Sequence, residues 1–235
     1  MEQYSRSEVR ILDHGYLRVV EDWGYGDAKI AEAGIIEAAR QSTKGSFRGW
    51  DRDEKLLNFL HNNKHSSPFE FAGMIIEVQA PIMVFREWHR HRTQSYNEMS
   101  GRYVELPDLC YIPSIPRLIS GKQSLINKQG SDEGFTAEDA GQLQMEFIEA
   151  GLRSRASYTR LINRGVSKEL ARLILPVNQY SRMRASANLR NWLAFLTLRT
   201  APNAQWEIRE YAEALASEMR ISFPKTMRLF DGLES

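Results

Sequence analysis

The amino-acid sequence predicts a single α+β domain over residues 1–235, with helices and a sheet sharing one core. Segments with apolar residues at helical spacing alternate with a few short segments rich in β-branched residues. No internal repeat, low-complexity tract or linker divides the chain, and its length suffices to bury one full core. This alternation of helices and few strands is typical of an α+β domain.

The N-terminal part is predicted to form two short strands and two helices. The strands, residues 9–11 and 16–20, flank a turn at Asp13-His14-Gly15. Asp27 would cap a helix that runs to about Lys44, and Asp51 would cap a second helix over residues 54–63. A polar loop, residues 64–70, would follow.

A strand at residues 74–78 is predicted to lead into a helix that begins at Pro81, where the missing proline donor is no loss. At about 100° per residue, one side of that helix is apolar and the other charged. The apolar side carries Val84, Phe85 and Trp88, and the charged side carries Arg86, Glu87 and Arg90, with His91 at its edge. The charged side leads into a predicted loop, residues 93–101.

The C-terminal half is predicted to be mainly helical. Residues 121–135 are polar and indicate a mobile surface loop. The predicted elements that follow are a helix over 136–163, a short helix over 168–175 capped by Ser167, a strand over 179–187, and helices over 188–199 and 204–221.

Composition narrows the class of protein. The formal net charge is +1, and no apolar run approaches the roughly 20 residues that span a bilayer. The N-terminus lacks an apolar signal core, so we expect a cytoplasmic protein without a membrane or nucleic-acid partner. Cys110 is the single cysteine and has no basic neighbour in sequence, which favours a buried or indifferent thiol.

Residues 88–103 concentrate the side chains most suited to chemistry. Arg90, Arg92 and Arg102 offer fixed fork-shaped donors that suit phosphate or carboxylate, although a solvated basic surface is the plain alternative. The interleaved polar residues Ser95, Asn97, Glu98 and Ser100 favour a ligand with phosphates and with hydroxyls or ring carbonyls. In a chain of balanced charge, this cluster indicates a discrete anionic ligand rather than a long polyanion.

His89 and His91 form a His-x-His pair that suggests zinc, but no second cluster supplies further ligands at clear spacing. We therefore expect no metal site.

Further candidates lie outside this segment. Arg199 would share a helix face with Asn188, Trp192 and Phe195, where a charge without a partner is costly; the alternatives are that it reaches solvent or pairs with a surface carboxylate. The same argument applies more weakly to Arg172.

His65 would stack on an aromatic ligand or be an ordinary loop histidine. Ser67, held extended before a proline, would point its hydroxyl at a phosphate. The sequence has no glycine-rich phosphate loop, so a dinucleotide would be held by side chains.

Several blocks of the chain together resemble the flavin-dependent thymidylate synthases. They are Ala38-Ala39-Arg40, His65-Ser66-Ser67-Pro68-Phe69-Glu70, Arg90-His91-Arg92 with Ser95, Asn97-Glu98, Ser100 and Arg102-Tyr103, Ala171-Arg172-Leu173-Ile174-Leu175-Pro176, Asn188-Leu189-Arg190 with Arg199, and Gln205-Trp206-Glu207-Ile208-Arg209. The resemblance covers most of the chain. It implies the mixed helix and sheet core of that family and an FAD-dependent methyltransferase that converts dUMP to dTMP. It also implies methylenetetrahydrofolate as carbon donor, NADPH as reductant, and a homotetramer with active sites between subunits.

The resemblance also implies roles for individual residues. Contacts to FAD would come from Ser67, Arg90, His91, Arg92, Glu98, Asn188 and Arg190, with His65 near the flavin and the folate. Contacts to dUMP would come from Glu87, Arg90, Ser100, Gly101, Arg102, Arg172 and Arg199. Arg199 would be catalytic, because it would favour ionisation of the uracil N3 and so activate the ring.

Three positions depart from the family pattern. Glu87 replaces a frequent glutamine, Ala194 a polar flavin contact, and Phe71 a histidine. Two other hypotheses remain: a non-catalytic nucleotide- or RNA-binding protein, and a flavin reductase that transfers no carbon. Flavin absorbance, and its bleaching by NADPH in the presence of dUMP, would separate the three.

Overall fold

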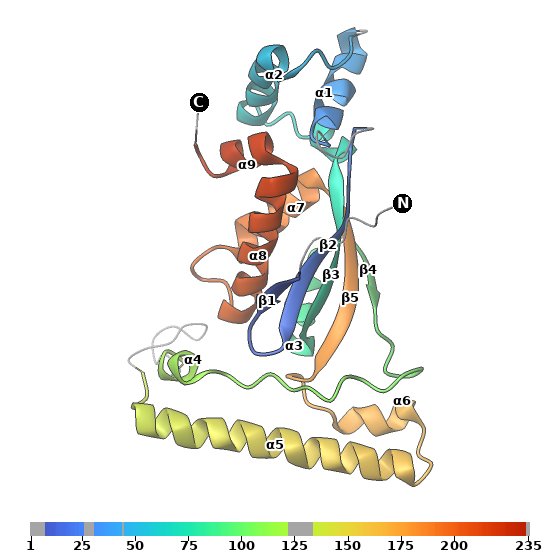
Figure 1. The fold of residues 1–235 in the computed structure, drawn as a ribbon, viewed down its shortest axis with the longest axis vertical. Helices are drawn as coiled ribbons and strands as arrows, with labels where there is room; N and C mark the ends of the chain where they lie inside the picture. Colours follow the sequence, from blue (N-terminus) through green and yellow to red (C-terminus); the bar gives the residue numbers. More distant parts are fainter. Residues whose placement is uncertain (1–7, 26–30, 44, 122–133, 234–235) are drawn as a thin grey trace.

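The computed structural model describes residues 8–25, 31–43, 45–121 and 134–233, and its centre is a five-stranded antiparallel sheet. The strand order is β1-β2-β3-β5-β4. The strands are β1 (Val9–Ile11), β2 (Gly15–Trp23), β3 (Gly73–Pro81), β4 (Ser95–Glu98) and β5 (Tyr180–Asn188). With helices on one side of this sheet and at both of its ends, the predicted α+β class is confirmed (Figure 1).

The two faces of the sheet differ in chemistry because successive side chains point to opposite sides of a strand. Ile76 of β3 and Met183 of β5 are buried in the core. On the opposite face, Arg18, Glu77 and Arg184 are neighbours by register, and both arginines form ion pairs with Glu77. The sheet therefore has one apolar face and one face of charged residues.

In the described residues, nine α-helices lie on one side of the sheet and at its two ends (Figure 1). They are α1 (Ala33–Arg40), α2 (Trp50–Asn62), α3 (Ile82–Trp88), α4 (Ile115–Ile119), α5 (Ala137–Asn163), α6 (Lys168–Ala171), α7 (Leu189–Arg199), α8 (Trp206–Ser222) and α9 (Pro224–Phe230). Three 3-10 helices are η2 (Gln41–Thr43), η3 (Ser67–Phe71) and η4 (Arg172–Ile174). Helices α3, α7 and α8 cover the apolar face, α1, α2 and α9 lie at one end, and α4, α5 and α6 lie at the other. None of the described helices is long and apolar enough to cross a membrane.

The helices that carry candidate residues begin at residues that suit a helix start. Pro81 precedes α3 with an extended backbone, as expected for a residue that has no N–H to donate. Asn188 begins α7, and its Oδ1 accepts a hydrogen bond of 3.0 Å from the N–H of Asn191. As predicted, Val84, Phe85 and Trp88 of α3 are buried and Arg86 is exposed.

Several predicted boundaries in the N-terminal half are wrong or fall outside the described residues. Asp27 is outside them, and α1 begins only at Ala33. Asp51 does not cap α2: the N-cap is Gly49, whose φ of 96° favours glycine, and Asp51 lies in the first turn. The predicted polar loop over residues 64–70 contains the start of η3.

Three further differences lie downstream. The predicted loop over residues 93–101 contains β4, whose four residues pair with β5. The predicted helix over residues 168–175 divides into α6 and η4, and the side chain of Ser167 makes no capping hydrogen bond. Most of the predicted surface loop, residues 122–133, lies outside the described residues.

Candidate active site

Arg199 lies at the end of α7 and is the best-held guanidinium among the candidates. Its Nε donates to Nε2 of His91 at 2.8 Å. Its two terminal nitrogens donate to the Glu87 carboxylate at 2.8 Å and to the Glu87 carbonyl oxygen at 2.9 Å. These three hydrogen bonds fix the plane of the guanidinium and use three of its five N–H donors.

Arg199 has a protein partner, because it forms an ion pair with Glu87. This is the alternative in which Arg199 pairs with a surface carboxylate. The side chain of Arg199 is 15% exposed and that of Glu87 is 42% exposed. One side of the ion pair is therefore open to a ligand.

His91 completes this group of three, here called the Arg199 cluster (Glu87, His91 and Arg199). Burial, together with the positive charge of Arg199, lowers the pKa of His91 to about 4. The ring is therefore neutral near pH 7, and because Nε2 accepts from Arg199, its proton is on Nδ1. The cluster holds one positive and one negative charge, so its net charge is zero.

The segment that follows α3 is fixed mainly through Tyr96 of β4. The Tyr96 hydroxyl lies 2.6 Å from the carbonyl oxygen of His91 and 3.2 Å from that of Trp88. Arg90 and Arg92 are exposed, and within the described part of the chain their side chains have no hydrogen-bond or ion-pair partner. Two unpaired guanidinium groups so close in the chain fit the phosphates of an anionic ligand.

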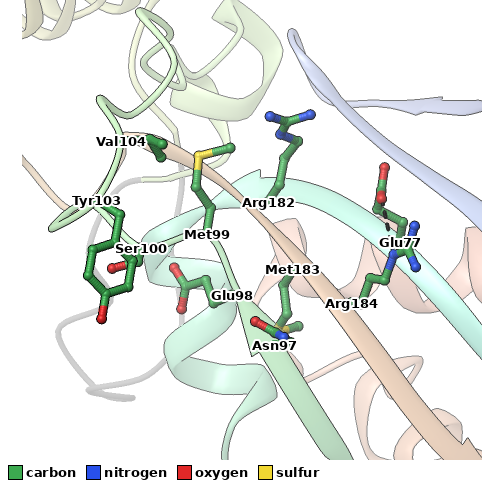
Figure 2. Close-up of a pocket in the computed structure, with 10 residues that line it drawn as sticks. All are labelled: Glu77, Asn97, Glu98, Met99, Ser100, Tyr103, Val104, Arg182, Met183 and Arg184. Carbon is green, nitrogen blue, oxygen red and sulfur yellow. Dashed lines mark hydrogen bonds and ion pairs between the residues drawn. The ribbon is translucent and has the colours of Figure 1, made fainter.

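A cavity of about 510 Å³ opens where β4, β5 and the loop after β4 meet. Figure 2 shows its lining residues, which include the predicted Glu98 and Ser100. Arg182 and Arg184 of β5 also line it, and the ion pair of Arg184 with Glu77 lies at its edge. The cavity therefore joins two predicted residues to charged residues of the sheet.

These charged residues of the sheet were not predicted from the sequence. Arg182 and Arg184 alternate along β5 and share its exposed face, a pattern that a strand prediction for residues 179–187 already contains. Their neighbour Glu77 comes from β3, and only the strand register brings it opposite Arg184. That pairing is not visible in the sequence.

Four of the residues that the resemblance assigns to dUMP meet beside the same loop, and three of them have side chains that could bind a ligand. Arg102 forms an ion pair of 3.4 Å with Glu169 of α6, and its backbone N–H donates to the Ser100 hydroxyl at 3.3 Å. Gly101 is buried, and a Cβ at that position would lie 3.4 Å from the Cδ of Arg172. Ser100, Arg102 and Arg172 therefore form a second group, here called the loop cluster.

A smaller cavity of about 180 Å³, here called the His65 cavity, gathers candidates from the segment before η3 and from α7. His65, Ser66 and Arg190 are among the residues that line it. The His65 ring meets Phe59 edge-on at a centroid distance of 5.5 Å, and Arg190 forms an ion pair with Glu70. Ser67 begins η3 beside this cavity. The walls of the cavity are mostly apolar, and Lys64 and Arg190 are cationic residues among its lining.

Among the described residues, no hydrogen bond or ion pair joins the loop cluster, or the His65 cavity, to the Arg199 cluster. Several predicted residues therefore come together in three groups that no hydrogen bond or ion pair among the described residues connects. Asn188 is occupied in capping α7.

Two other predictions concern side chains that would bind metal or attack a substrate. In the described residues, no group of three His, Cys, Asp or Glu side chains is placed to hold a metal ion. Burial raises the pKa of Cys110, so its thiol stays protonated near pH 7. The half-buried thiol therefore shows no sign of activation, and its indifference stays a prediction.

Comparison with known families and proteins agrees with the resemblance. The family described as thymidylate synthase complementing protein matches residues 24–225. Proteins named flavin-dependent thymidylate synthase are similar to the chain. One from Thermus thermophilus is 37% identical over 95% of this chain and 78% of its own length. One from Anaplasma marginale is 34% identical over 98% of this chain and 76% of its own length.

A solved structure is similar in fold as well as in sequence. The UMP/dUMP methylase PolB from Streptomyces cacaoi, bound with 5-Br dUMP, superposes with a TM-score of 0.83. It is 29% identical, with 95% of this chain and 97% of that chain covered. These matches do not favour the alternative of a non-catalytic nucleotide- or RNA-binding protein.

Proposed function

Because the chain belongs to the flavin-dependent thymidylate synthase family, we propose that it methylates dUMP to dTMP with a bound FAD. Methylenetetrahydrofolate would supply the carbon and NADPH the reducing equivalents. The family match over residues 24–225 carries this proposal. The arginines of the site suit a nucleotide, because guanidinium groups bind phosphate with paired donors.

The residues of the chain fit FAD in two respects. Arg90 and Arg92 offer exposed guanidinium groups for a pyrophosphate, and the His65 cavity offers apolar walls with Arg190 among its lining residues. When bound, the flavin would supply the hydride. The protein would hold the cofactor with side chains, because no glycine-rich phosphate loop is present.

The two clusters would bind opposite ends of dUMP. Ser100, Arg102 and Arg172 would hold the phosphate, because the loop cluster combines a hydroxyl with two cations. Arg199 would face the uracil ring and donate to a ring oxygen, where negative charge grows as the ring accepts a hydride. Its fixed orientation means that little reorganisation is needed as that charge grows.

Reduction of the purified protein by NADPH tests the proposed function. The protein, loaded with FAD, is mixed with NADPH without oxygen, and flavin absorbance is followed with and without dUMP. We expect faster bleaching with dUMP, then reoxidation and formation of dTMP when methylenetetrahydrofolate is added. A protein that binds no flavin, or one that oxidises NADPH without forming dTMP, would contradict the proposal.

The Arg92→Ala variant is expected to lose flavin. Arg92 is exposed and, in the described residues, has no protein partner, so its removal should leave the fold intact. A charge-assisted hydrogen bond contributes about 1.5–3 kcal/mol, so we expect the FAD dissociation constant to rise by roughly 10–150-fold. Fluorescence titration of FAD measures this. Arg153→Ala on α5, which removes an exposed ion pair with Glu149, is the control. Equal FAD affinity in both variants would end the assignment of Arg92.

We further infer a homotetramer in which each site takes the Arg199 cluster from one chain and the loop cluster from another. This inference rests on the observation that, among the described residues of one chain, no hydrogen bond or ion pair joins the two clusters. Co-expression of an Arg199→Ala chain with an Arg102→Ala chain should then restore roughly a quarter of the wild-type sites.

Co-expression of Arg199→Ala with His91→Ala is the matched control, because both residues belong to one cluster and no intact site can form. A monomer by light scattering would exclude shared sites. Mixed oligomers that stay as inactive as either parent would do the same.

A further inference from the structure

The segment that follows the loop cluster runs between the end of the sheet and helix α5 (Figure 1). Its residues 105–110 are here called the support segment. One face of α5 carries Gly151, Arg155 and Tyr158 at the spacing of successive helical turns, and the first and last of these are buried. A Cβ at Gly151 would lie 3.6 Å from the Cβ of Cys110. The support segment therefore packs on this face of α5.

Arg155 holds the support segment at two points. Its Nε lies 3.0 Å from a carboxylate oxygen of Asp108, and one of its terminal nitrogens donates to the carbonyl oxygen of Leu106 at 3.3 Å. The guanidinium also lies 5.2 Å from the centroid of the Tyr158 ring, where the aromatic face attracts a cation. The Arg155 side chain is 19% exposed, so protein groups rather than water surround most of it.

Leu106 connects this restraint to the loop cluster. Its side chain is buried and lies against Gly101. A Cβ at Gly101 would lie 3.4 Å from the Cγ of Leu106 and 3.4 Å from the Cδ of Arg172. The side chains of Leu106 and Arg172 therefore meet at Gly101, between Ser100 and Arg102. The position of Leu106 thus determines where this loop lies relative to Arg172.

The preceding residue of α5 holds the other half of the loop cluster. The Ser154 hydroxyl donates to the carbonyl oxygen of Ile174 at 2.7 Å, and Ile174 ends η4, the 3-10 helix that begins with Arg172. Arg172 is half-buried, and in the part of the chain that the structure describes its guanidinium has no hydrogen-bond or ion-pair partner. Its direction therefore depends on the placement of η4, and its donors remain available for a ligand.

We propose that Arg155 and Ser154 of α5 are positioning residues for the phosphate of dUMP. They hold the loop and η4 against one long helix, so that the donors of the loop cluster face the phosphate together. They act through the loop cluster and do not touch the nucleotide. The inference rests on the proposed function, in which the loop cluster binds this phosphate. Donors that are already in place bind more tightly, because ordering them on binding costs free energy.

Two ligands that differ only in the phosphate test the inference. The probes are dUMP and deoxyuridine, and their dissociation constants are measured by titration of the flavin absorbance of the FAD-loaded protein. Arg155→Met keeps most of the side-chain volume but removes the donors. We expect the dissociation constant of dUMP to rise by roughly tenfold and that of deoxyuridine to change by less than about twofold. An equal rise for both probes, or no rise for dUMP, overturns the inference.

Two further variants separate position from charge. Arg155→Met leaves the Asp108 carboxylate without its partner, and a negative charge near the phosphate would itself weaken binding. The double variant Arg155→Met with Asp108→Asn removes that charge and should bind dUMP as weakly as Arg155→Met. Recovery of the wild-type affinity in the double variant overturns the inference. Arg153→Ala removes an exposed arginine from the same helix and should bind both probes like the wild type. A loss of dUMP affinity there as large as in Arg155→Met also overturns it.

Ser154→Ala tests the other contact and decides the inference if Arg155→Met does not fold. Losing one hydrogen bond to η4 should raise the dissociation constant of dUMP by roughly three- to tenfold and leave that of deoxyuridine unchanged. In an Arg172→Ala protein the same substitution should have no further effect, because Ser154 acts through Arg172. A loss by the same factor in both backgrounds, or no loss in either, overturns the inference.

The wild-type protein separates this inference from the proposed function. If it converts dUMP to dTMP and prefers dUMP to deoxyuridine, but the variants bind dUMP normally, only the role of α5 is wrong. If the wild-type protein binds neither probe, the proposed function fails as well.

Discussion

Replacing Arg199 with alanine should lower the rate at which dUMP and methylenetetrahydrofolate oxidise the reduced flavin by roughly a hundred- to a thousandfold. The variant removes the guanidinium whose orientation is fixed by His91 and by the carboxylate and backbone carbonyl oxygens of Glu87. Negative charge that grows on the ring would then have no cation beside it. Stopped-flow flavin absorbance measures the rate, and flavin content and circular dichroism should match those of the unchanged protein.

Two further variants separate charge from geometry and from side effects. Arg199→Lys keeps the cation but loses the planar fork, so activity should return only in part. Arg199→Ala also leaves the Glu87 carboxylate without its partner. The double variant Arg199→Ala with Glu87→Gln removes that unpaired charge. If the double variant restores the rate, the defect came from the carboxylate, and Arg199 has only a structural role. An unchanged rate in Arg199→Ala itself would lead to the same conclusion.

Replacing Trp88 with alanine should destabilise the protein by about 3–5 kcal/mol. Trp88 of α3 is fully buried and lies against Phe195 of α7 at a ring centroid distance of 4.6 Å. Its Nε1 donates to the buried Gln94 side chain at 3.0 Å. The variant would leave a cavity between the two helices and a buried amide oxygen without a donor, and both effects lower the free energy of unfolding.

Urea unfolding followed by tryptophan fluorescence and circular dichroism measures the loss. Trp88→Phe fills most of the space and should lose a smaller amount, about 1–3 kcal/mol, because the Gln94 oxygen lacks its donor. Leu198→Ala on α7 is the control: its side chain is 61% exposed, and the change should stay within about 0.5 kcal/mol. A Trp88→Ala protein as stable as this control would mean that the packing of α3 against α7 does not depend on the tryptophan.

The sequence predicted the elements well where periodicity is strong. The apolar side of α3 and the length of α5 follow from spacing that the structure preserves. β4 was missed because four residues of mixed polarity carry no alternation that distinguishes them from a loop. Its conformation comes from pairing with β5, which lies far away in the sequence. The start of α2 was misplaced because a glycine with positive φ, rather than an acidic side chain, begins the helix.

The residues of the Arg199 cluster were named from the sequence, but their grouping was not. The spacing of arginines, hydroxyls and amides identified the segment after α3, and the structure brings Glu87, His91 and Arg199 together. The ion pair that neutralises Arg199 joins α3 to α7, more than a hundred residues apart. Local patterns contain no information about such a contact. The same limit explains why Arg182 and Glu77 were not predicted around the larger cavity.

Phe195 connects the packing of the core to the Arg199 cluster, so a core residue should affect substrate specificity. It contacts Trp88 inside the core and His91 in the Arg199 cluster, with ring centroid distances of 4.6 and 4.8 Å. It also lies about one turn before Arg199 on α7. A change of volume at Phe195 therefore shifts the imidazole that orients the guanidinium. Positions 195 and 91 should vary together as relatives diverge, and directed evolution of substrate preference should select mutations in this interior position as well as in residues that touch the nucleotide.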